Sequence, residues 1–159
     1  MGANTNAPCG FAPLELGPKY RAHLYRITNN YGTDLFMNDP VAVVTAGTIE
    51  RAGAGSSNVI LGTIVGLFLQ DGAKTARPEN LRPLPSDYLF FDASGLADTY
   101  DYWALVADDP DQIFYCQEDS DTTPLQITHI GANCNHVAGT GSSTTGISGA
   151  MLDRNTANS

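Results

Sequence analysis

Short apolar runs separated by turn-forming residues recur along most of the chain. The first run is 20–28, which a turn at 29–32 follows, and the next two are 41–44 and 47–51. The later runs are 88–92, 101–107, 112–118, 125–130, 133–138 and 147–152. Because turn signals return about every ten residues, the pattern predicts an all-β body, either a small β-barrel or a sandwich of tulip-like shape.

The most apolar segment, 59–70, has a composition that suits a helix as well as a strand. It is rich in β-branched residues, and Gly62 and Gly66 lie inside it. An interior glycine costs a helix about 1 kcal/mol, whereas in a strand it marks a bulge or a close approach of two backbones. We therefore expect one long core strand that bends at its glycines.

Residues 1–18 differ from the rest of the chain because they hold three prolines and few apolar side chains. Proline fixes φ and removes a backbone donor, so this stretch is neither a helix nor a central strand. This composition predicts an extended N-terminal arm that either docks on another surface or stays mobile, followed by a single body of residues 19–159. The apolar anchors of the arm are Phe11, Leu14 and Leu16.

Charge is unevenly distributed along the 159 residues. Residues 1–86 hold seven bases and six acids, and residues 87–159 hold one base and eleven acids, which divides the net charge of −9 into +1 and −10. Since apolar runs alternate with the acids, we expect the acidic half to be folded, with a face that suits solvent or a basic partner. A proline-rich loop is expected at 72–87. It holds the densest basic stretch, formed by Lys74, Arg77 and Arg82.

Composition argues against several classes of protein. No apolar run approaches the ~20 residues of a membrane helix, and residues 1–11 lack the basic and apolar regions of a signal peptide. Binding to nucleic-acid phosphates needs clustered Lys and Arg, so we expect neither a nucleic-acid nor a membrane partner. Cys9, Cys116 and Cys134 form neither a CxxC pair nor an even framework, and we interpret them as reduced thiols.

Motifs for catalysis are weak. His23, His129 and His136 are candidate bases, but a hydrolase also needs an oriented nucleophile, and the sequence has no GxSxG elbow. The glycine-serine stretch 139–146 lacks the lysine of a phosphate-binding loop and is typical of a hairpin loop. We therefore expect no enzymatic activity and no cofactor.

Two sets of residues are candidate metal ligands. His129, Cys134 and His136, with Cys116 as a fourth ligand, have the chemistry of a zinc site but not its paired spacings. The acids within 108–111 and 118–121 lack the glycine and the bidentate glutamate of an EF-hand loop. The sequence favours ordinary partly buried side chains and solvated turns over a metal site.

Three stretches of the chain, NTNAPCGFAPL, VADDPDQIFYCQED and GANCNHVAGTGSSTTGISGAMLD, together resemble a known protein family. This is the family of small head proteins of tailed bacteriophages that are encoded near the major capsid gene and understood as capsid cement or decoration proteins. The resemblance covers the arm and most of residues 104–153. Residues 20–100 match only in the order of their elements.

The resemblance implies a non-enzymatic structural protein of the virion. Such a protein would lie on the outer capsid surface of the finished particle and in the host cytoplasm during assembly. It would bind the major capsid protein, stabilise contacts between capsid subunits, and self-associate as a trimer or dimer on local symmetry axes. The expected contacts are Phe11, Leu14 and Leu16 of the arm and Lys74, Arg77 and Arg82 of the basic loop. The alternative is a head fibre or a host-surface adhesin that binds glycans, with Trp103 and its neighbouring tyrosines exposed on one patch.

Overall fold

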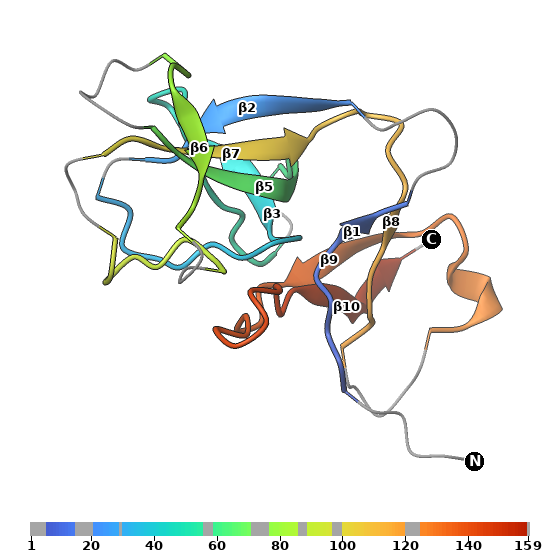
Figure 1. Cartoon of the computed structure of the whole chain (residues 1–159). Helices are drawn as coiled ribbons and strands as arrows, with labels where there is room; N and C mark the ends of the chain where they lie inside the picture. The colour runs from blue at the N-terminus through green and yellow to red at the C-terminus, as the bar shows by residue number, and fades with distance from the viewer. Residues whose placement is uncertain are drawn as a thin grey trace.

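The protein is all-β, as the sequence predicts (Figure 1). The computed structural model describes residues 6–14, 21–28, 30–55, 59–70, 77–85, 89–96, 100–119 and 125–158. In these residues the strands form antiparallel sheets, and the helical structure is limited to one 3₁₀ turn, η1 (Ile127–His129). Within the same residues, no helix is long and apolar enough to cross a membrane.

The larger sheet contains six strands. Its order is β2 (Ala22–Arg26), β7 (Tyr102–Ala107), β5 (Gly62–Gln70), β3 (Pro40–Val43) and β4 (Ile49–Arg51), and β6 (Leu81–Pro83) pairs with the end of β5. A single parallel bridge joins Ile27, after β2, to Ile49, at the start of β4. The sheet is therefore curved so that its two edges meet at one point, but in the described residues no ladder closes it into a barrel.

The glycines of β5 act as the sequence predicts. The register between β5 and β7 shifts between Ile64 and Gly66, which is the irregularity expected at a bulge. At Gly62 a Cβ atom would lie 2.1 Å from the carbonyl oxygen of Ala107 on β7. The bent core strand is confirmed, because only a residue without a side chain lets the two backbones approach this closely.

The two faces of the larger sheet bury different side chains. Tyr102, Ala104 and Val106 alternate along β7 and pack into the apolar core. Trp103 points to the opposite face, where it is 6% exposed and donates an indole N–H bond of 2.9 Å to Oε1 of Gln70. The buried indole therefore has a hydrogen-bond partner, and Trp103 is part of the interior and not of an exposed patch.

Two two-stranded sheets, which together we call the smaller sheet, bring together the first and the last strands. β1 (Ala12–Pro13) pairs with β8 (Phe114–Tyr115), and β9 (Asn133–Val137) pairs with β10 (Met151–Asn158). A parallel bridge between Glu118 and Leu152 connects the two pairs, so their spatial order is β1, β8, β10 and β9. Figure 1 shows this group beside the larger sheet.

Some of the predicted elements differ in the structure. The strand predicted at 125–130 is wrong, because this segment forms η1 with Ile127 and Ile130 exposed to 83% and 80%. The strand predicted at 147–152 begins only at Met151 and continues to Asn158. β6 forms inside the predicted loop 72–87, where the backbone of Leu81–Pro83 pairs with β5.

Candidate functional site

Residues 6–14, which are the described part of the predicted arm, lie against the protein's own body. Phe11 is only 9% exposed, and its N–H donates to the carbonyl of Asn38 at 2.9 Å. The side-chain amide of Asn38 in turn donates to the carbonyl of Cys9 at 3.0 Å. The segment is extended, as expected, but Phe11 is buried in the protein's own body, where its ring contacts that of His136.

Further contacts hold this segment along β8. The N–H of Leu14 donates to the carbonyl of Ile113 at 2.8 Å, and the side-chain amide of Gln112 donates to the carbonyl of Leu14 at 3.0 Å. Near the start of the segment, the N–H of Ala7 donates to Oε1 of Gln117 at 2.9 Å. The segment is thus fastened to its own chain at both ends of its described length.

The paired strands β1 and β8 expose an apolar surface, which we call the outer ribbon face and define by Leu14, Ile113 and Tyr115. These side chains are 43%, 51% and 62% exposed. Leu14 lies opposite Ile113, and Tyr115 is two residues from Ile113, so the three share one face of the ribbon. Acidic residues precede and follow β8 in the chain: Asp109, Asp111, Glu118 and Asp119.

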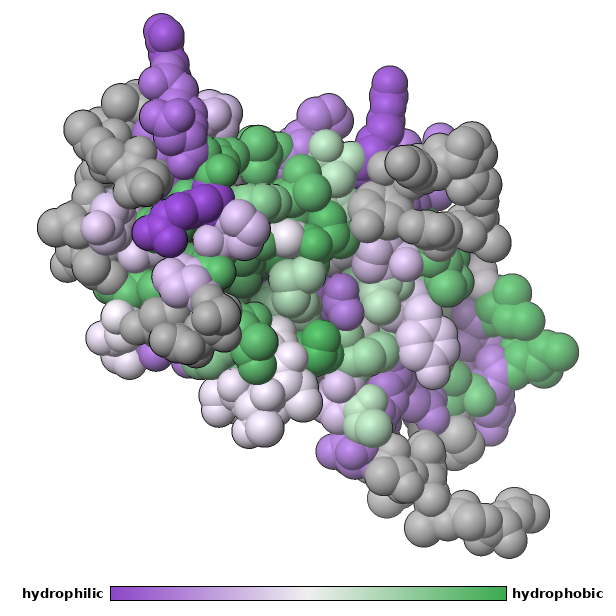
Figure 2. All heavy atoms as spheres, in the orientation of Figure 1, coloured by the Kyte–Doolittle hydropathy of each residue, from purple (hydrophilic) through white to green (hydrophobic). Residues whose placement is uncertain are grey.

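The 3₁₀ turn η1 exposes a second group of apolar residues. Leu125 is 39% exposed, and Ile127 and Ile130 are more than three-quarters exposed. The turn projects from the side of the smaller sheet in Figure 1, and Figure 2 shows hydrophobic atoms protruding at that edge of the molecule. Such exposed apolar groups are typical of surfaces that bind other molecules.

The other predicted contact residues lie apart from the outer ribbon face. Arg77 and Arg82 are exposed, and Arg82 is on β6 of the larger sheet. Figure 1 shows β6 well separated from β1 and β8. Leu16 and Lys74 lie outside the described residues. The structure therefore does not bring the predicted arm and loop contacts together on one surface.

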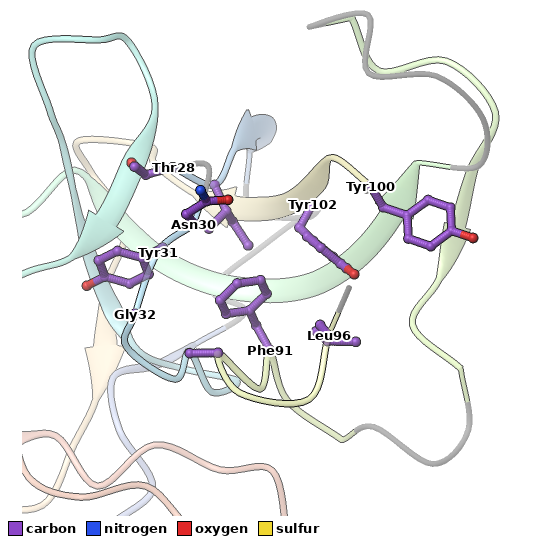
Figure 3. Close-up of a pocket in the computed structure, with 10 residues that line it drawn as sticks. Thr28, Asn30, Tyr31, Gly32, Phe91, Leu96, Tyr100 and Tyr102 are labelled. Atoms are coloured by element: carbon purple, nitrogen blue, oxygen red, sulfur yellow. The ribbon is translucent and has the colours of Figure 1, made fainter. Parts of the chain in front are cut away.

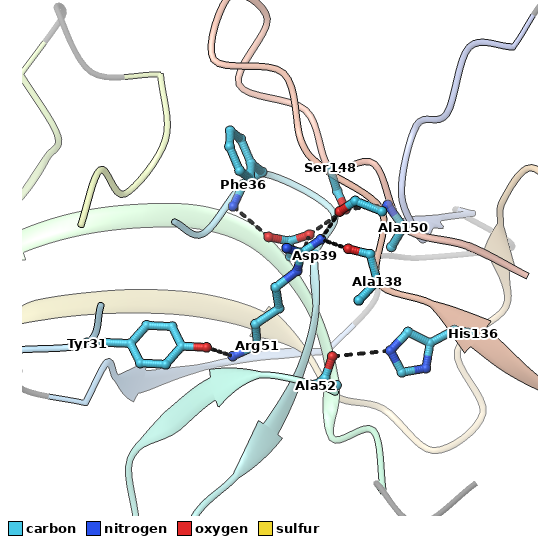
Figure 4. A network of polar contacts seen from close by, with 10 residues as sticks. Tyr31, Phe36, Asp39, Arg51, Ala52, His136, Ala138, Ser148 and Ala150 are labelled. Carbon is cyan, nitrogen blue, oxygen red and sulfur yellow. Dashed lines mark hydrogen bonds and ion pairs between the residues drawn. The ribbon is translucent and has the colours of Figure 1, made fainter. Parts of the chain in front are cut away.

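A buried polar network joins the larger sheet to the segment before β10 (Figure 4). The carboxylate of Asp39 is fully buried, accepts hydrogen bonds from the Ser148 hydroxyl and from the Phe36 N–H at 2.8 Å, and lies 3.6 Å from Nε of Arg51. The Arg51 guanidinium also donates to the carbonyls of Ala138 and Gly139. This network fixes the position of residues 138–150 on the body, which gives it a structural role.

Burial raises the pKa of the Asp39 carboxyl above its ordinary value. Three contacts act in the opposite direction: the positive charge of Arg51, the Ser148 hydroxyl and the Phe36 N–H. The loss of water around the carboxylate outweighs them because Asp39 has no exposed surface.

The candidate zinc residues have ordinary structural surroundings. His136 is buried, and its Nε2 lies 3.2 Å from the carbonyl oxygen of Ala52. Burial and the neighbouring Cys134 and Cys9 raise the pKa of the Cys116 thiol to about 11. Among the described residues, no three His, Cys, Asp or Glu side chains are placed so that they could hold a metal ion.

Sequence reasoning missed a contact between His23, Tyr25 and Asp108, the residue that directly follows β7. The Tyr25 hydroxyl donates to Asp108 at 2.5 Å, and Nδ1 of His23 lies 2.8 Å from the same carboxylate. Burial alone would raise the pKa of Asp108, but the hydrogen bonds from Tyr25 and His23 lower it overall. The β2–β7 register creates this contact, and a register cannot be read from either strand alone.

Comparison with known proteins does not identify a family for this chain. No family model, no curated protein and no solved structure matches the chain. The function is therefore argued from the surfaces and contacts described above.

Proposed function

We propose that this protein is a virion structural protein that binds the outer surface of a tailed-bacteriophage capsid as a cement or decoration protein. The observation that carries the proposal is the outer ribbon face, where three large apolar side chains are exposed on and directly beside the short hydrogen-bonded strands β1 and β8. Burying an apolar side chain completely contributes about 1.5–3 kcal/mol, so covering these partly exposed residues is a substantial driving force. The likeness to decoration proteins in sequence supplies the partner, the major capsid protein.

The acidic residues of the second half of the chain support the proposal of a protein partner that has basic residues around an apolar centre. The acidic residues on either side of β8 belong to the half of the chain that carries a net charge of −10. Opposite charge at the rim of an interface accelerates encounter and fixes orientation, while the apolar centre supplies affinity. A capsid surface with exposed Lys and Arg near an apolar groove fits this arrangement.

The separation of the two predicted contact sets suits a protein that stabilises contacts between subunits. β1, which Leu14 directly follows, and β6, which holds Arg82, lie in different parts of the molecule (Figure 1). One molecule can then contact two neighbouring capsid subunits, and binding to the assembled lattice shifts the equilibrium away from disassembly by mass action. In this proposal Phe11 acts as the internal anchor that holds Leu14 in place, and Leu14 makes the external contact.

The adhesin alternative relied on an exposed Trp103, which the structure places in the interior. Self-association as a dimer or trimer remains part of the proposal, because decoration proteins that lie on local symmetry axes contact one another as well as the capsid.

Co-sedimentation with purified phage heads tests the proposal. We expect the protein to sediment with mature heads of the encoding phage and not with precursor shells. A Leu14→Ser, Ile113→Ser double variant should reduce occupancy by about tenfold or more, since it removes the apolar centre of the contact. Val43→Ser is the matched control, because Val43 is 50% exposed on β3 of the other sheet. Equal occupancy of the double variant and the control, or no sedimentation of the unchanged protein, would refute the proposal.

A further inference from the structure

A cleft of about 210 Å³ opens on the larger sheet (Figure 3), and none of the residues that line it belongs to the outer ribbon face. It lies between the segment that follows β2 and the segments on either side of residues 97–99. Ten described residues line it: Ile27, Thr28, Asn30, Tyr31, Gly32, Phe91, Ala93, Leu96, Tyr100 and Tyr102. Its volume is below the ~300–1,000 Å³ of pockets for drug-sized ligands, so it has room for about one ring.

The walls of the cleft are aromatic and uncharged. Phe91 and Tyr102 form the floor, with ring centroids 5.2 Å apart in an edge-on arrangement, and both are less than 10% exposed. Figure 3 shows Tyr31 on one side of this pair and Leu96 and Tyr100 on the other. None of the ten residues is an acid, a lysine, an arginine or a histidine. A charged ligand would lose its hydration without gaining an opposite charge, so the lining selects a neutral one.

Polar groups at the edge of the cleft can both donate and accept hydrogen bonds. The side-chain amide of Asn30 has no hydrogen-bond partner among the described residues, although it offers two donors and an acceptor. Its backbone is in the left-handed region, with a φ of 56°. The hydroxyl of Thr28 lies beside it and shares a hydrogen bond of 2.7 Å with the hydroxyl of Thr48.

We propose that this cleft binds a single neutral sugar ring, such as a hexopyranose or an N-acetylhexosamine. A sugar ring presents C–H groups on its faces, which pack against aromatic rings, and hydroxyls at its edge, which donate and accept hydrogen bonds at the same atom. The floor of Phe91 and Tyr102 and the amide of Asn30 provide both kinds of partner. A proline ring would also stack on the floor, but it has no donor for the Asn30 carbonyl oxygen. The site is separate from the proposed capsid contact and does not depend on it.

The structure supplies a variant that blocks the cleft with little cost to the fold. A Cβ atom at Gly32 would meet no atom within 4 Å, and its backbone is outside the left-handed region. Gly32→Leu therefore places a side chain in open space at the edge of the cleft. Asn30→Gly is a second variant, since glycine keeps the positive φ and removes the amide. Thr144→Leu is the control, because it adds an exposed leucine to a turn outside the cleft.

The experiment is a ¹H–¹⁵N NMR titration with the methyl glycosides of glucose, mannose, galactose and N-acetylglucosamine. N-acetylneuraminic acid and a tetraproline amide are titrated separately. At least one neutral glycoside should shift the amide signals of Gly32, Phe91 and Ala93 with a dissociation constant in the millimolar range. Binding should weaken by about tenfold or more in Gly32→Leu and in Asn30→Gly and remain unchanged in Thr144→Leu.

Three outcomes would overturn the proposal. The first is the absence of saturable shifts at the cleft with all four neutral glycosides. The second is equal or stronger binding of the anionic sugar or of the tetraproline peptide. The third is unchanged glycoside binding in both cleft variants, with NMR spectra that show them to be folded.

Discussion

The ring of Phe11 meets the imidazole ring of His136 edge-on, with centroids 6.2 Å apart and an interplanar angle of 86°. This contact joins the segment before β1 to β9, a strand that follows it by more than a hundred residues in the chain. Edge-on aromatic pairs contribute about 0.5–1.5 kcal/mol beyond the burial of their surface. Phe11 is therefore the buried side chain that anchors the middle of the N-terminal segment, between the hydrogen bonds of Ala7 and Leu14.

Replacing Phe11 by Ala should destabilise the protein by about 3 kcal/mol, because a buried phenylalanine is lost and a cavity remains. Urea unfolding measures this loss, and hydrogen exchange should show faster exchange of the Phe11 and Leu14 amides. Leu14→Ala is the control, with an expected loss below about 1 kcal/mol, since Leu14 is 43% exposed. Equal losses in the two variants would contradict the anchor role of Phe11.

Ser148→Ala removes one of the donors to the buried carboxylate of Asp39. The same hydroxyl oxygen accepts the N–H of Ala150 at 3.0 Å, so the substitution removes one hydrogen bond from each of two buried groups, the Asp39 carboxylate and the Ala150 N–H. We expect a loss of about 2–3 kcal/mol in the free energy of unfolding. Ser143→Ala, at an exposed position in the nearby turn, should change it by less than about 0.5 kcal/mol. A thermal or urea unfolding series that ranks the two variants equally would argue against the network.

Two glycines give a matched test of the close approach between β5 and β7. Gly62→Ala should destabilise the protein by about 3 kcal/mol or more, since the new Cβ would lie 2.1 Å from a backbone oxygen. Gly32→Ala should stabilise it by about 0.4–1 kcal/mol, because the site is open and alanine reduces the freedom of the unfolded chain. Differential scanning calorimetry should show opposite shifts in Tm. Shifts of the same sign would be inconsistent with this packing.

The contact of Tyr25 with Asp108 predicts a dependence of stability on pH. The folded pKa of Asp108 lies below its unfolded value of about 3.8, so the ionised carboxylate stabilises the fold above that pH, and this stabilisation is lost as the pH falls through the folded pKa. Tyr25→Phe should cost about 1.5 kcal/mol near neutral pH, and the difference should shrink below pH ~4. Urea unfolding of both proteins at several pH values measures the difference in their free energy of unfolding. A difference that stays constant across the acid range would exclude the ionised carboxylate as its source.

The pKa of Cys116, which burial raises to about 11 from 9.0, predicts slow alkylation. Because the thiolate is the reactive form, two pKa units reduce its fraction at neutral pH by about a hundredfold. Iodoacetamide labelling followed by peptide mass spectrometry should show Cys116 reacting far more slowly in the folded protein than in denaturant. Equal rates in the two states would show that the thiol is not held in a buried site.

The local parts of the fold follow from the sequence because their causes are local. The β-branched run with Gly62 and Gly66 predicts both the strand and its irregularities, and the short apolar run within 101–107 predicts β7. The strand predicted at 125–130 is wrong because an apolar run normally indicates a buried strand, whereas Ile127 and Ile130 are exposed. Only the folded chain shows that their neighbours leave them uncovered.

The candidate sites depend on contacts between distant residues, which explains why sequence reasoning found them only in part. Leu14 was singled out, but its neighbour Ile113 on the outer ribbon face comes from the β1–β8 register. The aromatic cleft combines side chains that follow β2, such as Tyr31, with distant ones such as Phe91 and Tyr102, and nothing in either part of the sequence alone indicates that they meet. Trp103 was a natural candidate for exposure, yet the alternation of β7 and the amide of Gln70 place it inside.

The pairing of the N-terminal segment with β8 has a consequence for synthesis. Ala7 and its partner Gln117 are 110 residues apart. At ~5–20 residues per second, a ribosome takes roughly 5–20 s to make the partner strand after the first segment has been made. During that interval Leu14 has no partner strand from its own chain, so nascent chains on one messenger can exchange this segment with one another before each has completed its own sheet.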